Sequence, residues 1–288
     1  MAAMTPTDVT REWVVPRWRA LGWFRDSPVS QRLVFAAVAL LLLVAVFGPL
    51  FAPHDPLLAA GEPYQSPNRS FPFGTDNAGR DMLSRCLSGL SVTLFYGIAI
   101  VVVALLIGGA VGLIAGAAGG WLDTLLMRTT DLFLALPAAV LSIAVVAALG
   151  PSLFHTFLAI GLFWWPYYAR LIRVEVKALA ARPHIEAAKL AGVSRRRRLL
   201  RHLLPGTIPT AIVAASLDLG AAIILLATLS FIGLGAQPPS PELGSMTASG
   251  LPDLHTAWWI AAIPGLLVFV VILVANMAGD ALRDLVDR

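Results

Sequence analysis

The amino-acid sequence predicts an all-α membrane protein with six transmembrane helices and both termini in the cytoplasm. Hydrophobic residues make up 58% of the 288 residues and charged residues only 13%, whereas about a quarter of the residues in ordinary soluble domains are charged. The mean hydropathy is +0.78, and the hydrophobic residues lie in runs of about the length that spans a bilayer. This composition excludes a disordered or fibrous protein and a soluble nucleic-acid scaffold.

Six runs of low charge predict the six helices, since about 20 apolar residues cross the hydrocarbon core. The first run lies behind a 32-residue tail and is 19 residues long. It is therefore longer than the apolar core of a signal peptide and is predicted to be retained. Gly150 and Pro151 separate the third run from the fourth. The runs cover residues 33–51, 92–118, 132–149, 152–169, 207–231 and 258–278.

The distribution of lysine and arginine predicts the orientation, because short cytoplasmic loops collect these residues. With the N-terminus inside, 18 of the 21 basic residues lie on the cytoplasmic side, and only Arg69, Arg80 and Arg85 lie outside. The sequence pI of about 9.7 therefore reflects membrane orientation, and no nucleic-acid partner is expected.

The longest predicted cytoplasmic segment, residues 170–206, is far larger than a turn between two helices requires. Pro183 favours the first turn of a helix, and Gly192 favours its left-handed end. Ser194 is a candidate cap for a second, basic helix, which Pro205 is expected to end. Two uses remain open: docking of the first helix in a groove of a partner protein, or binding of the amphipathic segment to membrane lipid.

Motifs in this segment resemble the EAA loop of the permeases of ABC importers. The residues that carry the resemblance are Glu186, Ala187, Ala188, Gly192, Leu204 and Pro205. Residues 201–205, with His202 where an aliphatic residue is usual, are similar to the dipeptide/oligopeptide/nickel branch, and most of all to its C-type permease subunits. Further stretches that resemble this branch, in the same order, are residues 73–81, 127–137, 229–244 and 279–284.

The resemblance implies a permease with type I ABC importer architecture in the bacterial inner membrane, forming half of the translocation pathway for di- or oligopeptides. It implies a homologous permease as the partner in a heterodimer, two ATP-binding subunits that carry ATP and Mg, and an extracytoplasmic substrate-binding protein. It also implies that the coupling residues are Glu186, Ala187, Ala188 and Gly192, supported by Arg195, Arg198, His202 and Pro205.

The same resemblance implies a division of the chain into three parts. Residues 1–32 are expected to form a cytoplasmic tail, and residues 33–90 the first transmembrane helix and an external loop. Residues 91–288 are expected to form the transporter core, with the coupling loop at about 174–206.

Asp218 is the only carboxylate well inside a predicted helix, where an ionised acid costs at least about 2.5 kcal/mol. It has two interpretations: a residue of the pathway that meets the amino group of a peptide, or a hydrogen-bonding residue between helices. The branch often carries an acid near the end of the fifth helix, where this chain has Leu226.

Four glycines at intervals of four residues predict a stripe for close helix packing, against either the partner permease or another helix of the same chain. They are Gly108, Gly112, Gly116 and Gly120. In the external loop, Asp76, Arg80 and Asp81 predict either a local salt-bridge cluster or a contact with the substrate-binding protein.

The sequence lacks the motifs of an ATPase or a metalloenzyme. It has no Gly-Lys pair, hence no phosphate-binding P-loop, no His-Glu-x-x-His motif, and a single cysteine, Cys86. No catalytic residue, metal site or bound cofactor is predicted, and the chain is not expected to be an enzyme. The alternative function is a secondary transporter or channel that works without ATPases, although such proteins usually show internal repeats or several intramembrane ionisable residues.

Overall fold

The computed structural model describes residues 28–286, and within that range it contains helices and an isolated β-bridge but no strand. Residues 1–27 of the predicted tail and residues 287–288 lie outside the described part. The long helices are α2 (Val29–Phe47), α3 (Met82–Ala118), α6 (Leu153–Ala180), α9 (Leu204–Phe231) and α11 (Trp259–Val286). The short elements are η2 (Gly48–Phe51), α4 (Gly120–Leu134), α5 (Ala138–Leu149), α7 (Pro183–Leu190), α8 (Arg195–Arg198), η3 (Leu199–Leu203), α10 (Leu243–Gly250) and η4 (Leu251–Asp253).

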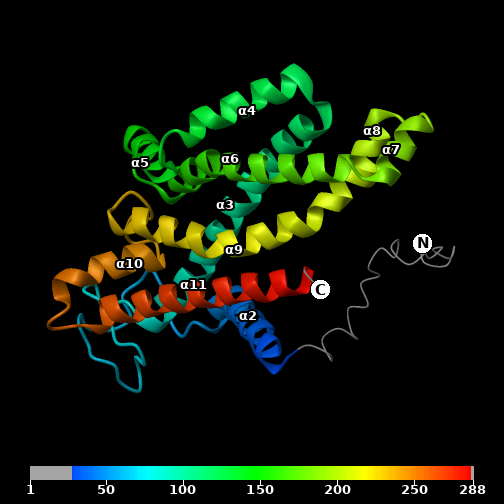
Figure 1. Ribbon diagram of the computed structural model, residues 1–288. Helices are drawn as coiled ribbons and strands as arrows, with labels where there is room; N and C mark the ends of the chain where they lie inside the picture. Colours follow the sequence, from blue (N-terminus) through cyan, green and yellow to red (C-terminus); the bar gives the residue numbers. More distant parts are fainter. Residues whose placement is uncertain (1–27, 287–288) are drawn as a thin grey trace.

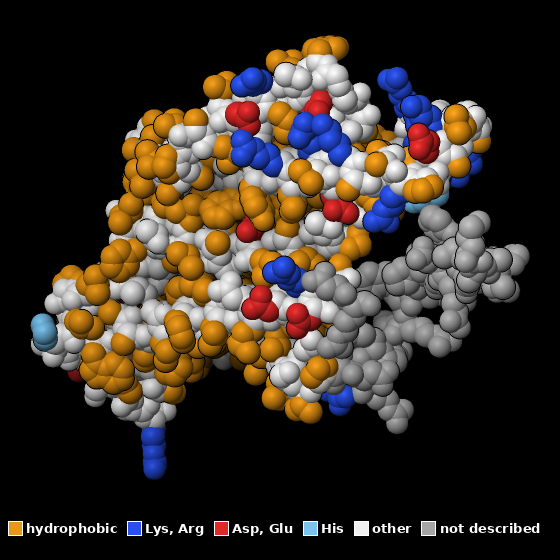
Figure 2. All heavy atoms as spheres, viewed as in Figure 1, with side chains coloured by type: hydrophobic (Ala, Val, Ile, Leu, Met, Phe, Trp, Pro, Cys, Tyr) orange, Lys and Arg blue, Asp and Glu red, His pale blue; other side chains and the backbone are white. Residues whose placement is uncertain are grey.

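Helices α6, α9 and α11 lie side by side and α3 crosses them obliquely, with α7 and α8 at one end of the molecule and α10 at the other (Figure 1). Figure 2 shows that, on this face, charged side chains gather over α4, α6, the α7–α8 end and the C-terminal end of α11, whereas hydrophobic side chains predominate toward the opposite end. The α7–α8 end carries the basic segment and is therefore the cytoplasmic end.

Within residues 28–286, four stretches are long and apolar enough to cross a membrane: Val29–Phe51, Met82–Ala118, Arg195–Phe231 and Trp259–Val286. The pair α4 and α5 adds a fifth if it forms one span. Helix α6 has 28 residues but lower hydropathy, because two tryptophans, a proline and two tyrosines occupy residues 164–168. The predicted count of six spans is therefore not confirmed, although each predicted run is largely helical.

The third predicted helix, residues 132–149, is broken. Helix α4 begins earlier, at Gly120, and the chain bends by 76° between α4 and α5. Pro137 stands just before α5 and disfavours the helical conformation of the residue that precedes it, which accounts for the break.

The glycine stripe packs α3 against α6 of the same chain. A Cβ atom added at Gly108 would lie 2.7 Å from the Cβ of Tyr168, and one added at Gly116 would lie 2.8 Å from the Cβ of Val176. Gly112 is equally close to the α6 backbone. Gly120 does not belong to the stripe, because Gly119 has a positive φ of 65° and ends α3.

The core lies where α3, α6 and α9 meet. Its fully buried members include Ile100 from α3, Ile160 and Tyr168 from α6, and Leu226 and Leu229 from α9. Leu226, the position at which the branch often carries an acid, is thus closed to water in this chain.

Acidic side chains order the external end. Asp76 accepts hydrogen bonds from the backbone of Ala78 and Arg80 at 2.9 Å, and its other oxygen lies 2.7 Å from the Nε of Arg80. Asp81 instead caps α3 by accepting from the backbone N–H of Leu83 and Ser84. These contacts agree with the structural interpretation of the three residues.

Glu242, a fully buried residue, caps α10 at the same end. It accepts hydrogen bonds from the backbone N–H of Gly244 and Ser245 at 2.9 and 2.8 Å, and Thr93 of α3 donates to it at 3.2 Å. Burial raises the pKa of the Glu242 carboxyl. This residue therefore ties the external helix α10 to α3.

Candidate coupling site

Helix α7 forms where the sequence predicts a helix. Pro183 occupies its first turn, Glu186 lies in the same turn near the positive end of the helix, and Lys189 lies in the last turn. The helix spans Pro183–Leu190, and only Ile185 is buried.

Gly192 ends α7 in the left-handed conformation, with φ of +77°. Its N–H donates to the carbonyl of Lys189 at 3.1 Å, and the N–H of Val193 donates to the carbonyl of Ala188 at 3.0 Å. This pair of hydrogen bonds is a Schellman motif, which closes a helix end and fixes a sharp corner. Ser194 then caps α8 by accepting from the N–H of Arg197, as predicted.

The prediction that Pro205 ends the basic helix is wrong. Residues Arg195–Phe231 form one continuous span, in which α8 is followed by the π-helical turn η3 and then by α9. Pro205 lies in the first turn of α9. A π turn rearranges the backbone hydrogen bonds just before the proline, so the ring and the missing N–H are tolerated without a break.

The predicted loop of residues 170–206 is also shorter than expected, because α6 continues to Ala180. The α6 extension carries Arg170, Arg173 and Lys177, which pair with α4. Arg170 lies 2.6 Å from Asp131, and Asp123 binds both Arg173 and Lys177, the latter at 2.6 Å. These ion pairs connect α4 to the α6 extension.

The outward face of α7 carries Glu186, Ala187 and Leu190, all exposed, and Ala188 is partly buried beside it. Leu190 is 85% exposed, the largest exposed fraction among the large hydrophobic side chains of the described residues. The sequence interpretation missed Leu190 as a site residue. The sequence signal that could have indicated Leu190 is a large apolar residue at the end of a predicted helix whose small apolar residues are alanines.

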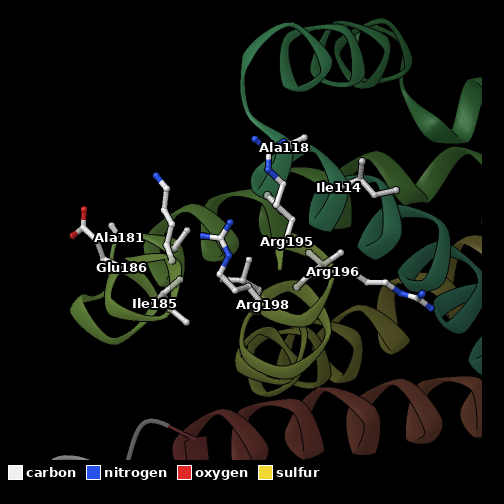
Figure 3. A pocket seen from close by; sticks show the side chains of 13 residues that line it. Ile114, Ala118, Ala181, Ile185, Glu186, Arg195, Arg196 and Arg198 are labelled. Atoms are coloured by element: carbon white, nitrogen blue, oxygen red, sulfur yellow. The ribbon is translucent and has the colours of Figure 1, made fainter. Parts of the chain in front are cut away.

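The predicted supporting residues fall into two groups. Arg195 and Arg198 lie with Glu186 around a cavity behind α7, where Figure 3 shows the Glu186 carboxylate pointing away from both arginines. His202 and Pro205 are exposed and lie outside this cavity. Arg195 and Arg198 therefore form one site with α7, and the other two residues do not join it.

Asp218 lies on the side of α9 that faces α6 and is partly buried. The indole Nε1 of Trp164 donates to its Oδ2 at 3.4 Å. The side chain of Tyr168 is buried nearby. The helix-to-helix hydrogen bond considered for Asp218 is thus present.

Comparisons with known proteins identify the family. A model of the family described as "Binding-protein-dependent transport system inner membrane component" matches residues 108–288. The probable D,D-dipeptide transport system permease protein of Escherichia coli K12 is 41% identical over 254 residues, which cover 87% of this chain and 84% of the relative. The di/tripeptide transport system permease protein of Pseudomonas aeruginosa is 39% identical, covering 86% of this chain and 84% of the relative.

Another relative matches the whole chain. The glutathione transport system permease protein of Escherichia coli O6:K15:H31 is 40% identical over 294 residues, covering 100% of this chain and 94% of the relative. Among solved structures, a chain of the methionine ABC transporter MetNI superposes with a TM-score of 0.58 at 18% identity. That match covers 72% of this chain and 98% of the other, and it shows a shared fold. With this fold and these relatives, the chain belongs to the family of binding-protein-dependent transport system inner membrane components.

Proposed function

We propose that the chain is the permease subunit of an ATP-driven importer of small peptides or of a peptide-like solute such as glutathione. Its relatives are named as permeases for D,D-dipeptides, for di- and tripeptides and for glutathione. The observation that carries the coupling part of the proposal is the exposed helix α7, fixed by the Schellman corner at Gly192 to a continuous 37-residue span.

Helix α7 is the lever in this proposal. Its outward face offers Ala187 and Leu190, so a partner groove can approach the backbone closely and enclose one large apolar side chain. Ile185 holds the opposite face in the protein. A push on α7 is then transmitted through Gly192 and α8 to α9 as a rigid-body motion, which opens the pathway to alternate sides of the membrane.

The proposal assigns ATP hydrolysis to two partner subunits, which hold ATP and Mg, whereas this chain binds no cofactor and performs no catalysis. The other half of the pathway comes from a homologous permease of a different gene, and an external binding protein delivers the solute. The family description, which names binding-protein-dependent transport, supports these partners.

Asp218 is proposed to meet the amino group of the peptide in the pathway. It is a partly exposed carboxylate in the middle of α9, and Trp164 already orients one of its oxygens. Exchange of Asp218 for Asn removes the charge, whereas exchange of Trp164 for Phe removes only the hydrogen bond between the helices. If the charge matters, Asp218→Asn raises the KM for peptides with a free amino group, and Trp164→Phe leaves it nearly unchanged.

The function is tested by purifying the tagged chain from its native membrane in mild detergent and identifying the accompanying proteins by mass spectrometry. Recovery of a second permease and of ATPase subunits is expected, together with peptide uptake in proteoliposomes only when ATP is supplied on the α7 side. A chain that is purified alone and still moves solute in liposomes without ATP would instead be a secondary transporter or channel.

A further inference from the structure

A cavity of about 580 Å³ lies behind α7, at the cytoplasmic ends of the long helices. It is bordered by the end of α3, the end of α6, one side of α7 and the start of the Arg195–Phe231 span, as Figure 3 shows. The exposed residues of the α7 lever, Ala187 and Leu190, do not line it. The cavity thus shares Glu186, Arg195 and Arg198 with the coupling site, whereas the two side chains proposed to contact the ATPase lie outside it.

The polar side chains of the cavity carry an excess of positive charge. Four cations line it, Lys189, Arg195, Arg196 and Arg198, against the single acid Glu186. The Nε of Arg198 is buried and has no hydrogen-bond partner among the described residues. Because a buried donor without an acceptor is costly, an acceptor placed in the cavity would be stabilised by this N–H group.

The remaining lining of the cavity is apolar. Ile114, Ala117 and Ala118 come from the last turns of α3, and Leu199 and Leu203 come from the π turn that leads into α9. A small soluble anion has no apolar part that could contact these side chains. An anionic lipid, in contrast, can place its phosphate among the cations and its acyl chain along the apolar side chains.

From this arrangement we infer that the cavity binds the phosphate headgroup of an anionic phospholipid from the cytoplasmic leaflet. The phosphate lies between Arg195 and Arg198, and the upper part of an acyl chain lies over Ile114 and Ala118. A lipid in this place fills the space between α7 and the ends of α3 and α6. It thereby stiffens the connection between the lever and the membrane-spanning helices.

The experiment measures lipid binding to the purified full chain in detergent by native mass spectrometry. Phosphatidylglycerol is compared with phosphatidylcholine, which has no net charge, and with glycerol 3-phosphate, which has no acyl chains. The variants are Arg198→Gln and, as a matched control from the same run of four arginines, Arg197→Gln, since Arg197 does not line the cavity. A third variant, Ala118→Phe, fills the apolar floor and leaves every charge in place.

The expected result is preferential binding of phosphatidylglycerol, weakened about fivefold by Arg198→Gln and unchanged by Arg197→Gln. Ala118→Phe is expected to weaken it as well. Equal losses in the two arginine variants would mean that the basic run attracts lipid without a site, and equal binding of phosphatidylcholine would mean that the headgroup is not recognised. Displacement of the lipid by equimolar glycerol 3-phosphate, or full binding in Ala118→Phe, would overturn the acyl-chain part. Loss of ATPase recovery in Arg198→Gln with normal lipid binding would assign the cavity to the ATPase instead.

Discussion

Exchange of Gly192 for valine perturbs the Schellman corner and leaves every other residue of the coupling site unchanged. Gly192 has φ of +77°, and an added Cβ would have no atom within 4 Å, so the variant introduces no steric clash with the surroundings. What remains is the left-handed backbone, which costs a non-glycine residue roughly 1–2 kcal/mol. A β-branched side chain lies at the upper end of that range. The conformation in which the corner holds α7 in place is thus expected to be destabilised by about 2 kcal/mol, which lowers its population roughly thirtyfold.

The assay measures recovery of the ATPase subunits with the tagged chain and ATP-dependent uptake in proteoliposomes, with membrane insertion and yield measured in parallel. Gly192→Val is expected to reduce recovery and uptake strongly and to leave insertion unchanged. Gly192→Asn is expected to restore most of both, because asparagine tolerates the left-handed conformation.

Gly233→Val is the matched control. Gly233 has φ of +85° at the external end of α9, with open space around its Cβ position and the same two hydrogen bonds, from Gly233 to Ser230 and from Leu234 to Leu229. It carries the same strain far from α7, so ATPase recovery should stay normal. Normal uptake in Gly192→Val would refute the lever, and equal damage by asparagine and valine would show that side-chain bulk matters rather than the backbone angle.

Three further predictions concern α7, the α3–α6 contact and the external cap. Leu190→Ala removes a side chain that is 85% exposed. The thermal stability of the chain is therefore expected to stay unchanged, while ATPase affinity, measured by titration, falls by about 2 kcal/mol; unchanged affinity would place the docking contact elsewhere. Gly108→Leu forces α3 and α6 apart and lowers the melting temperature in detergent, whereas Gly109→Leu, where an added Cβ meets nothing within 4 Å, serves as the control and leaves it unchanged. Glu242→Ala removes the cap of α10 and lowers the free energy of unfolding by about 1–2 kcal/mol. Glu242→Gln costs less, because burial already raises the pKa of this carboxyl and an amide oxygen still accepts the N–H groups; equal losses in the two variants would contradict this reasoning.

Local sequence signals predicted the coupling corner well. Pro183, Gly192 and Ser194 each act within one turn of their own position, and each occupies the predicted place at the start of α7, its end and the cap of α8. The glycine stripe on α3 likewise predicted close packing, although only the structure shows that α6 is the helix that fills it.

The signals that failed depend on the surroundings. Pro205 stops a regular α-helix, but a π turn at Leu199–Leu203 lets the span continue through it. Arg170 and Lys177 were predicted to lie in a loop, yet they lie on helix α6, where they pair with acids on α4. The exposure of Leu190 could not be predicted, since a helix of eight residues buries whichever side its neighbours cover.

The π turn also determines the direction in which α7 points. Each residue advances an α-helix by about 100° around its axis, so one residue more or fewer between α8 and α9 rotates everything before the turn by that angle. The five residues Leu199–Leu203 therefore set the azimuth of α7 around the axis of α9. The length of this turn thus determines toward which side of the membrane helices a partner's movement is directed. A change in the turn length would alter that direction without altering any residue that the partner touches.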